Sequence, residues 1–167
     1  KLLPGLNPAL PFPIILVLHR KSGKDDILTN LLAGRTEMMV KEVEEKEEML
    51  PATIYIAPPN YHLLIENDHT FSLDASEKVN FSRPSIDVTF QSAAEVFKEN
   101  LVCLLLSGAN SDGSAGLKIV KEFGGAALVQ DPDSAVVSFM PESAIANVEV
   151  DAVLKSSEMS EYINNLP

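Results

Sequence analysis

Four short apolar runs alternate along the chain with segments that have helical spacing. The apolar runs are 12–18, 53–58, 101–106 and 126–130, and the helical segments are 25–33, 86–97, 116–123 and 158–164. Short runs that are apolar throughout are typical of strands covered on both faces. Strands that alternate with helices build a mainly parallel sheet. The sequence therefore predicts an α/β, doubly wound fold, with helices on both faces of a mainly parallel sheet.

Residues 51–74 depart from this alternation. The stretch offers three short strands separated by the turn-forming sequences APPN and ENDH. We interpret it as a small antiparallel hairpin insertion at a sheet edge. The charged run 41–48 is interpreted as a solvated surface segment. Because the sequence contains no repeat and nothing that resembles an interdomain linker, we expect residues 1–167 to form one domain.

The charge and the hydropathy of the chain argue against nucleic acid as a partner and against insertion into a membrane. Acidic residues outnumber basic residues by 24 to 13, and the formal net charge of −11 repels nucleic acid and anionic lipid. The apolar runs are shorter than the roughly 20 residues of a membrane-spanning helix. Prolines interrupt the N-terminal residues, which do not resemble a cleavable signal. The single cysteine, Cys103, has no partner for an internal disulfide, which favours a reducing, cytoplasmic location.

The stretch SGANSDGSAG, residues 107–116, follows an apolar run and leads into a helical segment. In a doubly wound sheet, ligands and catalytic groups gather at this end of the strands. Asp112 is open to two interpretations, an N-cap of the helix that carries Leu117 and Val120, or a site carboxylate. A phosphate-binding loop is a weaker interpretation, because the stretch matches neither G-x-G-x-x-G nor G-x-x-x-x-G-K.

The three histidines differ in their surroundings. His19 ends the first apolar run, where a proton carrier with an ordinary pKa near 6.5 could act as base and then as acid, or could simply end the strand. His62 heads a predicted strand, and we expect a hydrogen-bonded structural role. His69 is expected at an exposed loop tip. No spacing of histidine, cysteine or carboxylate residues is typical of zinc or calcium, so we expect no metal and no cofactor.

Five blocks of the sequence occur together and in order over residues 12–154. They are IILVLHRK, TIYIAPPNYHLLI, VNFSRPSIDVTFQSAAEVF, LLLSGANSDGSAGLKIVKEFGGAALVQD and VVSFMPESAIANVEVDAVL. This series resembles the catalytic domain of the chemotaxis protein-glutamate methylesterases, the CheB type. The resemblance implies an α/β hydrolase that removes methyl esters from glutamate side chains on the cytoplasmic helices of chemoreceptors. It also implies deamidation of certain glutamines there.

The resemblance also implies roles for individual residues. The family uses a Ser, His, Asp triad, in which His19 matches the histidine and Asp112 the aspartate. A serine hydroxyl needs a base, and the base needs a carboxylate that fixes its tautomer. Backbone N–H groups of Gly108, Ala109 and Asn110 are candidates for an oxyanion hole. The family usually has methionine where Ala109 stands, so side-chain packing beside the site differs.

The family's serine lies in a glycine-rich turn after the first strand, upstream of the histidine. This sequence begins at Lys1 in what resembles the following helix, and Ser114 in DGSAG has only the second glycine of G-x-S-x-G. We expect that the first strand and the nucleophile turn are missing. Nothing resembles the receiver domain that restrains many family members until it is phosphorylated. The alternative is a catalytically inactive binding or regulatory module of the same fold.

Two further blocks contain polar residues near the predicted site. Pro84, Ser85 and Asp87 form a favourable helix start, so a structural role is expected for them. Arg83 is open to two interpretations, a contact with an acidic receptor surface or a salt bridge within this acidic chain. Met140 and Pro141 are expected to turn the chain into a short helix near the site without a catalytic role.

Overall fold

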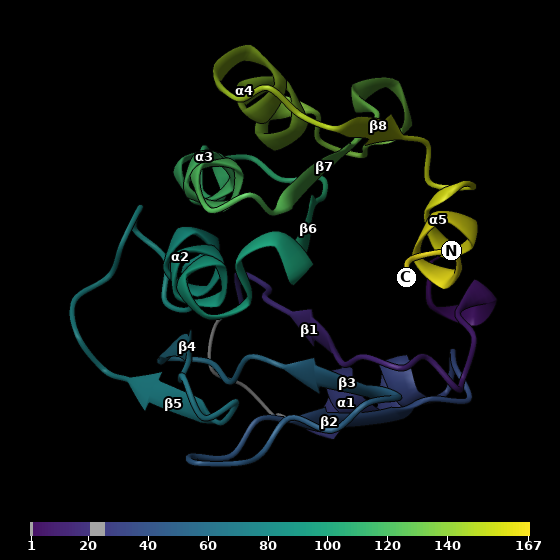
Figure 1. Ribbon diagram of the computed structural model, residues 1–167, viewed down its shortest axis with the longest axis vertical. Coiled ribbons are helices and arrows are strands. Elements are labelled where there is room, and N and C mark those ends of the chain that lie inside the picture. The colour runs from purple at the N-terminus through teal and green to yellow at the C-terminus, as the bar shows by residue number, and fades with distance from the viewer. Residues whose placement is uncertain (1, 21–25) are drawn as a thin grey trace.

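The computed structural model describes residues 2–20 and 26–167 (Figure 1). The strands there are β1 Ile14–Leu16, β2 Met39–Glu42, β3 Thr53–Ile56, β4 His62–Ile65, β5 Phe71–Asp74, β6 Val102–Leu105, β7 Ala126–Gln130 and β8 Ala152–Leu154. The α-helices are α1 Asp26–Ala33, α2 Ile86–Phe97, α3 Ser114–Glu122, α4 Phe139–Asn147 and α5 Met159–Asn164. The predicted α/β class is confirmed. The helical segment expected from residue 25 begins at Asp26, and residue 25 lies outside the described residues.

The parallel strands form two groups of three. One sheet has the order β1-β3-β2 and the other has the order β6-β7-β8, and every pairing within them is parallel. In the part of the chain that the structure describes, no hydrogen-bonded ladder joins β1 to β6. The sequence predicts a single mainly parallel sheet, but the described strands form two sheets, with the edge strands β1 and β6 on the sides that face each other (Figure 1).

The middle strand of each sheet carries the core. All four residues of β3 are buried, as are the last four residues of β7. Their side chains pack on both sides because a strand flanked by two parallel neighbours has helices or loops over each face. Burial of a full aliphatic side chain contributes about 1.5–3 kcal/mol. These two strands therefore anchor the loops that follow the neighbouring strands β1 and β6.

The antiparallel hairpin is smaller than predicted. Only β4 and β5 form it, and they pair from His62 opposite Asp74 to Ile65 opposite Phe71. The first strand expected in this insertion, β3, belongs instead to the parallel sheet, because it is buried on both faces. The hairpin also packs on α2 instead of extending a sheet edge, since Thr89 donates to the Leu63 carbonyl and the Ile65 N–H donates to Ser92.

The charged run 41–48 is only partly a solvated surface segment, which corrects the prediction. Lys41 and Glu42 belong to the edge strand β2. Ion pairs hold both side chains, because Lys41 contacts Glu47 at 2.6 Å and Glu42 pairs with Arg20. Charged side chains are compatible with an edge strand, where one side of the strand faces solvent.

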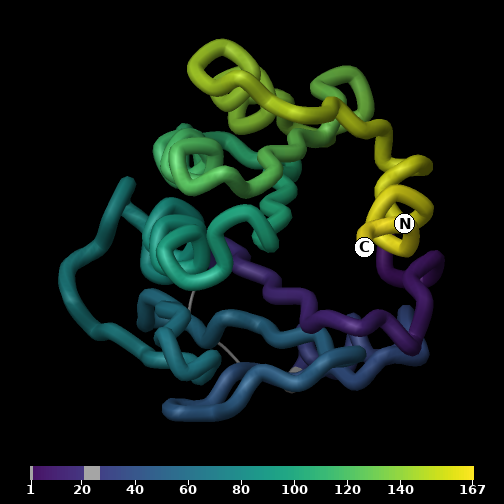
Figure 2. The backbone as a smooth tube through the Cα atoms, in the orientation of Figure 1, coloured from purple at the N-terminus to yellow at the C-terminus, as the bar shows by residue number. Residues whose placement is uncertain are grey.

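The two end segments of the chain lie side by side (Figure 2). The Asn164 side chain joins them, because its Oδ1 accepts from the Asn7 N–H at 2.8 Å and its Nδ2 donates to the Gly5 carbonyl at 2.8 Å. Among the residues of the two described ranges, no helix has the length and apolar character needed to cross a membrane.

Helices α2 and α3 pack closely against each other, and Gly116 lies at their contact. A Cβ atom at Gly116 would stand 2.7 Å from the Phe90 Cβ and 3.0 Å from the Asp87 Cα. Neither atom lies at the end of a flexible side chain, so neither moves away easily. The contact therefore requires glycine inside a helix, where glycine is otherwise unfavourable.

We expect Gly116→Ala to lower the free energy of unfolding by about 1–3 kcal/mol, although alanine favours helix formation, because the added methyl group overpacks the α2–α3 contact. Urea unfolding followed by circular dichroism measures the change. Gly34→Ala is the matched control, because its nearest neighbours would stand 3.5 Å away and leave room. Equal stabilities of the two variants would contradict the prediction.

Candidate active site

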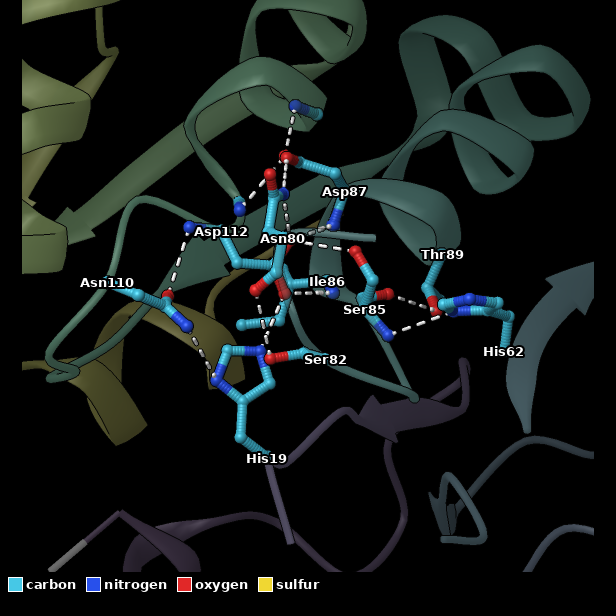
Figure 3. Close-up of polar contacts among 12 residues, drawn as sticks. His19, His62, Asn80, Ser82, Ser85, Ile86, Asp87, Thr89, Asn110 and Asp112 are labelled. Atoms are coloured by element: carbon cyan, nitrogen blue, oxygen red, sulfur yellow. Dashed lines mark hydrogen bonds and ion pairs between the residues drawn. The ribbon is translucent and has the colours of Figure 1, made fainter. Parts of the chain in front are cut away.

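His19 and Asp112 meet at the carboxyl ends of β1 and β6 (Figure 3). The two residues are 93 positions apart in the sequence, and His19 Nε2 lies 2.6 Å from Asp112 Oδ2. Each comes from a loop that leaves a strand at the same end, which is where a parallel sheet gathers its polar groups. The His19 side chain is 27% exposed, whereas the Asp112 side chain is fully buried behind it. The pair thus has one face toward solvent.

The Asp112 carboxylate accepts hydrogen bonds from five donors. Oδ2 accepts from His19 Nε2 and from the Ile86 N–H, both at 2.6 Å. Oδ1 accepts from Ser85 Oγ at 2.8 Å, Asn80 Nδ2 at 3.0 Å and the Asp87 N–H at 3.1 Å. Burial by itself raises the pKa of Asp112, but the hydrogen bonds from His19, Ile86, Asn80 and Asp87 outweigh it and hold the pKa well below its usual range. Asp112 is therefore an ionised acceptor.

Asp112 caps a helix as well as contacting the histidine. The predicted cap of the helix that carries Leu117 and Val120 is wrong, because the helix that Asp112 caps is α2, whereas the role of Asp112 as a catalytic carboxylate stays a prediction. Ser85, at the N-cap of α2, forms no side-chain cap to its own helix, and Asp112 accepts from the first N–H groups of α2 instead. The positive end of the α2 dipole further favours the negative charge.

Asp87 makes the reciprocal contact. Its Oδ1 accepts from the N–H groups of Gly113 at 2.9 Å and Gly116 at 2.6 Å, at the start of α3. The structural role expected for Asp87 is thus present, but at the neighbouring helix. Burial raises the pKa of Asp87, the Gly116 N–H lowers it, and the charge on Asp112 raises it again; the net shift is upward.

The other nitrogen of the imidazole ring, Nδ1, lies beside Asn110. Asn110 Nδ2 lies 3.5 Å from this nitrogen, and Asn110 Oδ1 accepts from the Asp112 N–H at 3.0 Å. Because an ionised carboxylate only accepts, the proton between His19 and Asp112 belongs to Nε2. In the neutral ring, the lone pair of Nδ1 therefore accepts from Asn110 Nδ2 at 3.5 Å, and a nucleophile that uses Nδ1 must displace this long contact.

The three candidate oxyanion donors differ in availability. The Gly108 N–H already donates to the Val137 carbonyl at 3.1 Å, which removes Gly108 from the predicted oxyanion hole. Gly108 is needed for packing instead, because a Cβ there would lie 1.8 Å from the Met140 sulfur. Within the described ranges, the N–H groups of Ala109 and Asn110 donate to no protein acceptor.

The expected short helix at Met140 and Pro141 is present as α4.

Arg83 does not contact the histidine and aspartate. Its Nη1 donates to the carbonyls of Ala75 at 2.7 Å and Ser76 at 2.5 Å. In the part of the chain that the structure describes, Arg83 forms no ion pair, so the predicted salt bridge is wrong. The guanidinium group satisfies backbone carbonyls of the loop before α2, which need donors because no sheet pairs them.

The other two histidines have the surroundings expected from the sequence. His62 is buried, its Nδ1 accepts from the Ser85 N–H at 3.2 Å, and its Nε2 donates to the Glu77 carbonyl at 2.8 Å. These contacts confirm a structural role and support the start of α2. His69 is exposed at the turn between β4 and β5.

No hydroxyl group forms a hydrogen bond with the His19 ring among residues 2–20 and 26–167. The serine considered from the sequence, Ser114, lies at the start of α3 and donates to Ser143 Oγ at 3.3 Å. The same residues include no group of three or more histidine, cysteine or carboxylate side chains placed to hold a metal ion. The site as described thus consists of a histidine, a buried carboxylate bonded to it and two backbone N–H groups that donate to no described acceptor.

Comparisons with known proteins give consistent results. A family model described as CheB methylesterase matches residues 1–163. The crystal structure of the Thermotoga maritima CheB methylesterase catalytic domain superposes with a TM-score of 0.95 at 36% identity, and covers 99% of this chain and 89% of that one.

Two relatives extend the comparison to whole proteins. A Leptospira interrogans protein, provisionally named protein-glutamate methylesterase/protein-glutamine glutaminase, is 48% identical over 165 residues, which are 99% of this chain and 86% of that protein. The Thermotoga maritima protein-glutamate methylesterase/protein-glutamine glutaminase is 35% identical over 168 residues. The match covers 99% of this chain and 49% of the Thermotoga protein.

We expect the stability difference between the wild type and Asp112→Asn to depend on pH. Because folding lowers the pKa of Asp112, its ionised form stabilises the fold above the unfolded pKa of about 3.9, and this contribution falls as the pH drops toward the folded pKa. Urea unfolding should give a difference that shrinks as the pH falls below about 4. A difference that is unchanged at low pH would show that Asp112 is not preferentially ionised in the folded state.

We also expect neutral His19 to carry its proton on Nε2. Long-range ¹H–¹⁵N correlation spectra of the imidazole distinguish a protonated nitrogen from a lone-pair nitrogen. In Asp112→Asn the carboxylate acceptor is lost, and the Nε2–H preference should weaken. An Nδ1–H ring in the wild type would contradict the assignment.

Proposed function

The chain belongs to the CheB methylesterase family, and we propose on this basis that it hydrolyses glutamate methyl esters on chemoreceptors by a Ser-His-Asp mechanism. The observation that carries the proposal is the 2.6 Å contact between His19 Nε2 and the buried, ionised Asp112. A histidine held in this way has Nδ1 left to take a proton once the long contact with Asn110 Nδ2 is displaced.

The proposed reaction passes through an acyl-enzyme. His19 Nδ1 removes the proton of a serine hydroxyl as its oxygen attacks the ester carbonyl, and Asp112 stabilises the imidazolium ion. The N–H groups of Ala109 and Asn110 stabilise the oxyanion. The imidazolium proton then passes to the departing methoxide, which leaves as methanol. Water deacylates the serine by the same path and leaves a glutamate side chain. With an amide substrate, ammonia is the leaving group, and the same steps deamidate glutamine.

We propose that the serine lies in a turn at the end of a further strand, which pairs with β1 on one side and with β6 on the other. This turn would place the serine beside His19. Strand β1 pairs only with β3, and β6 only with β7, among the described residues. Both strands therefore present an edge that can accept a further parallel strand. Such a strand would end beside the loops of His19 and Asp112, because the carboxyl ends of neighbouring parallel strands share one edge of the sheet.

The partners follow from the proposed reaction. The substrate is a methylated glutamate on a cytoplasmic helix of a chemoreceptor, so the proposed location is the cytoplasm. The acidic chain, with a net charge of −11, does not favour nucleic acid as a partner. No step of the reaction requires a cofactor.

We expect the full-length protein to release methanol from a receptor fragment that carries glutamate methyl esters. His19→Gln and Asp112→Asn should each lower kcat by about 10³–10⁴-fold, because the first variant removes the base and the second removes the anion that fixes its tautomer. Gas chromatography of methanol measures the rate.

His69→Gln is the matched control, since His69 is an exposed histidine at a loop tip. Its kcat should stay close to that of the wild type. A wild-type protein that binds the methylated fragment but releases no methanol would refute the esterase and favour the inactive binding module.

A further inference from the structure

Asn80 lies in the loop between β5 and α2 and connects two carboxylates. Its Nδ2 donates to Asp87 Oδ2 at 2.7 Å and to Asp112 Oδ1 at 3.0 Å (Figure 3). A side-chain amide nitrogen has two N–H bonds, so each carboxylate receives one of them. The amide therefore joins the group that orients His19 to the group that caps α3.

The backbone around Asn80 is strained. Asn80 has a φ of 50° and Phe81 a φ of 61°, both in the left-handed region that residues other than glycine rarely adopt. The Phe81 side chain is 97% exposed, so it contributes almost no burial that would hold this conformation. Strain of this kind persists only where other contacts maintain it. Backbone hydrogen bonds between Val79 and Ser82 close this two-residue turn, and the two hydrogen bonds of the Asn80 amide attach the turn to the carboxylates.

Asn80 differs from the other donors to Asp112 in its location, because it lies in the loop before α2 and not at the start of the helix. Ser85, Ile86 and Asp87 all belong to the start of α2, and His19 is the group to be oriented. Within residues 2–20 and 26–167, the Asn80 amide is the remaining donor to this carboxylate. It binds Oδ1, the oxygen that does not contact His19, and so limits rotation of the carboxylate about its Cβ–Cγ bond.

We propose that Asn80 is a positioning residue, which holds the Asp112 carboxylate in the orientation that aligns His19 Nε2. The effect of Asn80 on catalysis rests on the proposed function. The hydrogen bond between Asn80 and Asp112 does not depend on that function. The titratable side chains that face Asp112 in the described part of the chain are His19 and Asp87. The amide separates the charges of Asp87 and Asp112, which otherwise repel each other.

The test compares Asn80→Gly with Asn60→Gly in the full-length protein. Asn60 is also exposed and left-handed, with a φ of 68°, so both variants relieve backbone strain and only the first removes the amide between the carboxylates. Asn80→Gly should lower kcat by about tenfold with little change in KM, since a hydrogen bond to a charged group is lost. It should also move the acid limb of the pH–kcat profile to higher pH, because a carboxylate with fewer donors holds the imidazolium proton more strongly.

The spectroscopic arm does not require activity. The ¹H resonance of the His19 Nε2–H, downfield because of its bond to Asp112, should shift or broaden in Asn80→Gly and stay unchanged in Asn60→Gly. If Asn80→Gly unfolds, the isosteric Asn80→Asp variant provides the same readouts, with larger changes because it adds a third carboxylate.

Each outcome is decisive. Identical kcat, pH profile and His19 resonance in Asn80→Gly and the wild type would overturn the positioning role. An inactive wild type would refute the proposed function alone, and a shifted resonance in Asn80→Gly would then still support the contact.

Discussion

The ionised Asp112 side chain is the interaction on which the rest of the site depends. It is fully buried, and an isolated carboxylate in that position would lose its hydration without compensation. Five donors from two distant parts of the chain, residue 19 and residues 80–87, replace the lost water. The loops after β1 and β6 and the start of α2 must therefore all be in place before His19 has a partner. The fold supplies this arrangement because both loops leave strands at the same end.

The contact between α2 and α3 shows how packing and electrostatics support each other. Each helix begins without a side-chain cap from its own N-cap residue and receives a carboxylate from the other segment. This exchange requires the helices to lie close together, which Gly116 permits. The cost is a pair of neighbouring carboxylates whose pKa values are shifted in opposite directions. Asp112, whose pKa is lowered, contacts His19, and Asp87, whose pKa is raised, caps α3. The same type of side chain therefore has a different environment at each position.

Much of the fold and part of the site could be predicted from the sequence, because these features depend on residues that are close together in the chain. Apart from Thr53 and Gln130, strands β3 and β7 consist of hydrophobic residues, and local composition is enough to recognise them. Positions after such strands drew attention to His19 and Asp112. Asn80 was missed because its importance comes from contacts with residues that are distant in the sequence or one turn into a helix, and an asparagine in a loop has many possible roles. Likewise, only the structure shows that the Gly108 N–H is already bonded to Val137.

The exchange of caps between α2 and α3 has a consequence for local unfolding. The amide protons of Ile86 and Asp87 are bonded to Asp112, and those of Gly113 and Gly116 to Asp87. Opening either helix start removes the acceptor that protects the other, so these four amides belong to a single cooperative unit of hydrogen exchange. A fluctuation that frays the start of either helix is therefore expected to disturb the carboxylate that bonds to His19 as well.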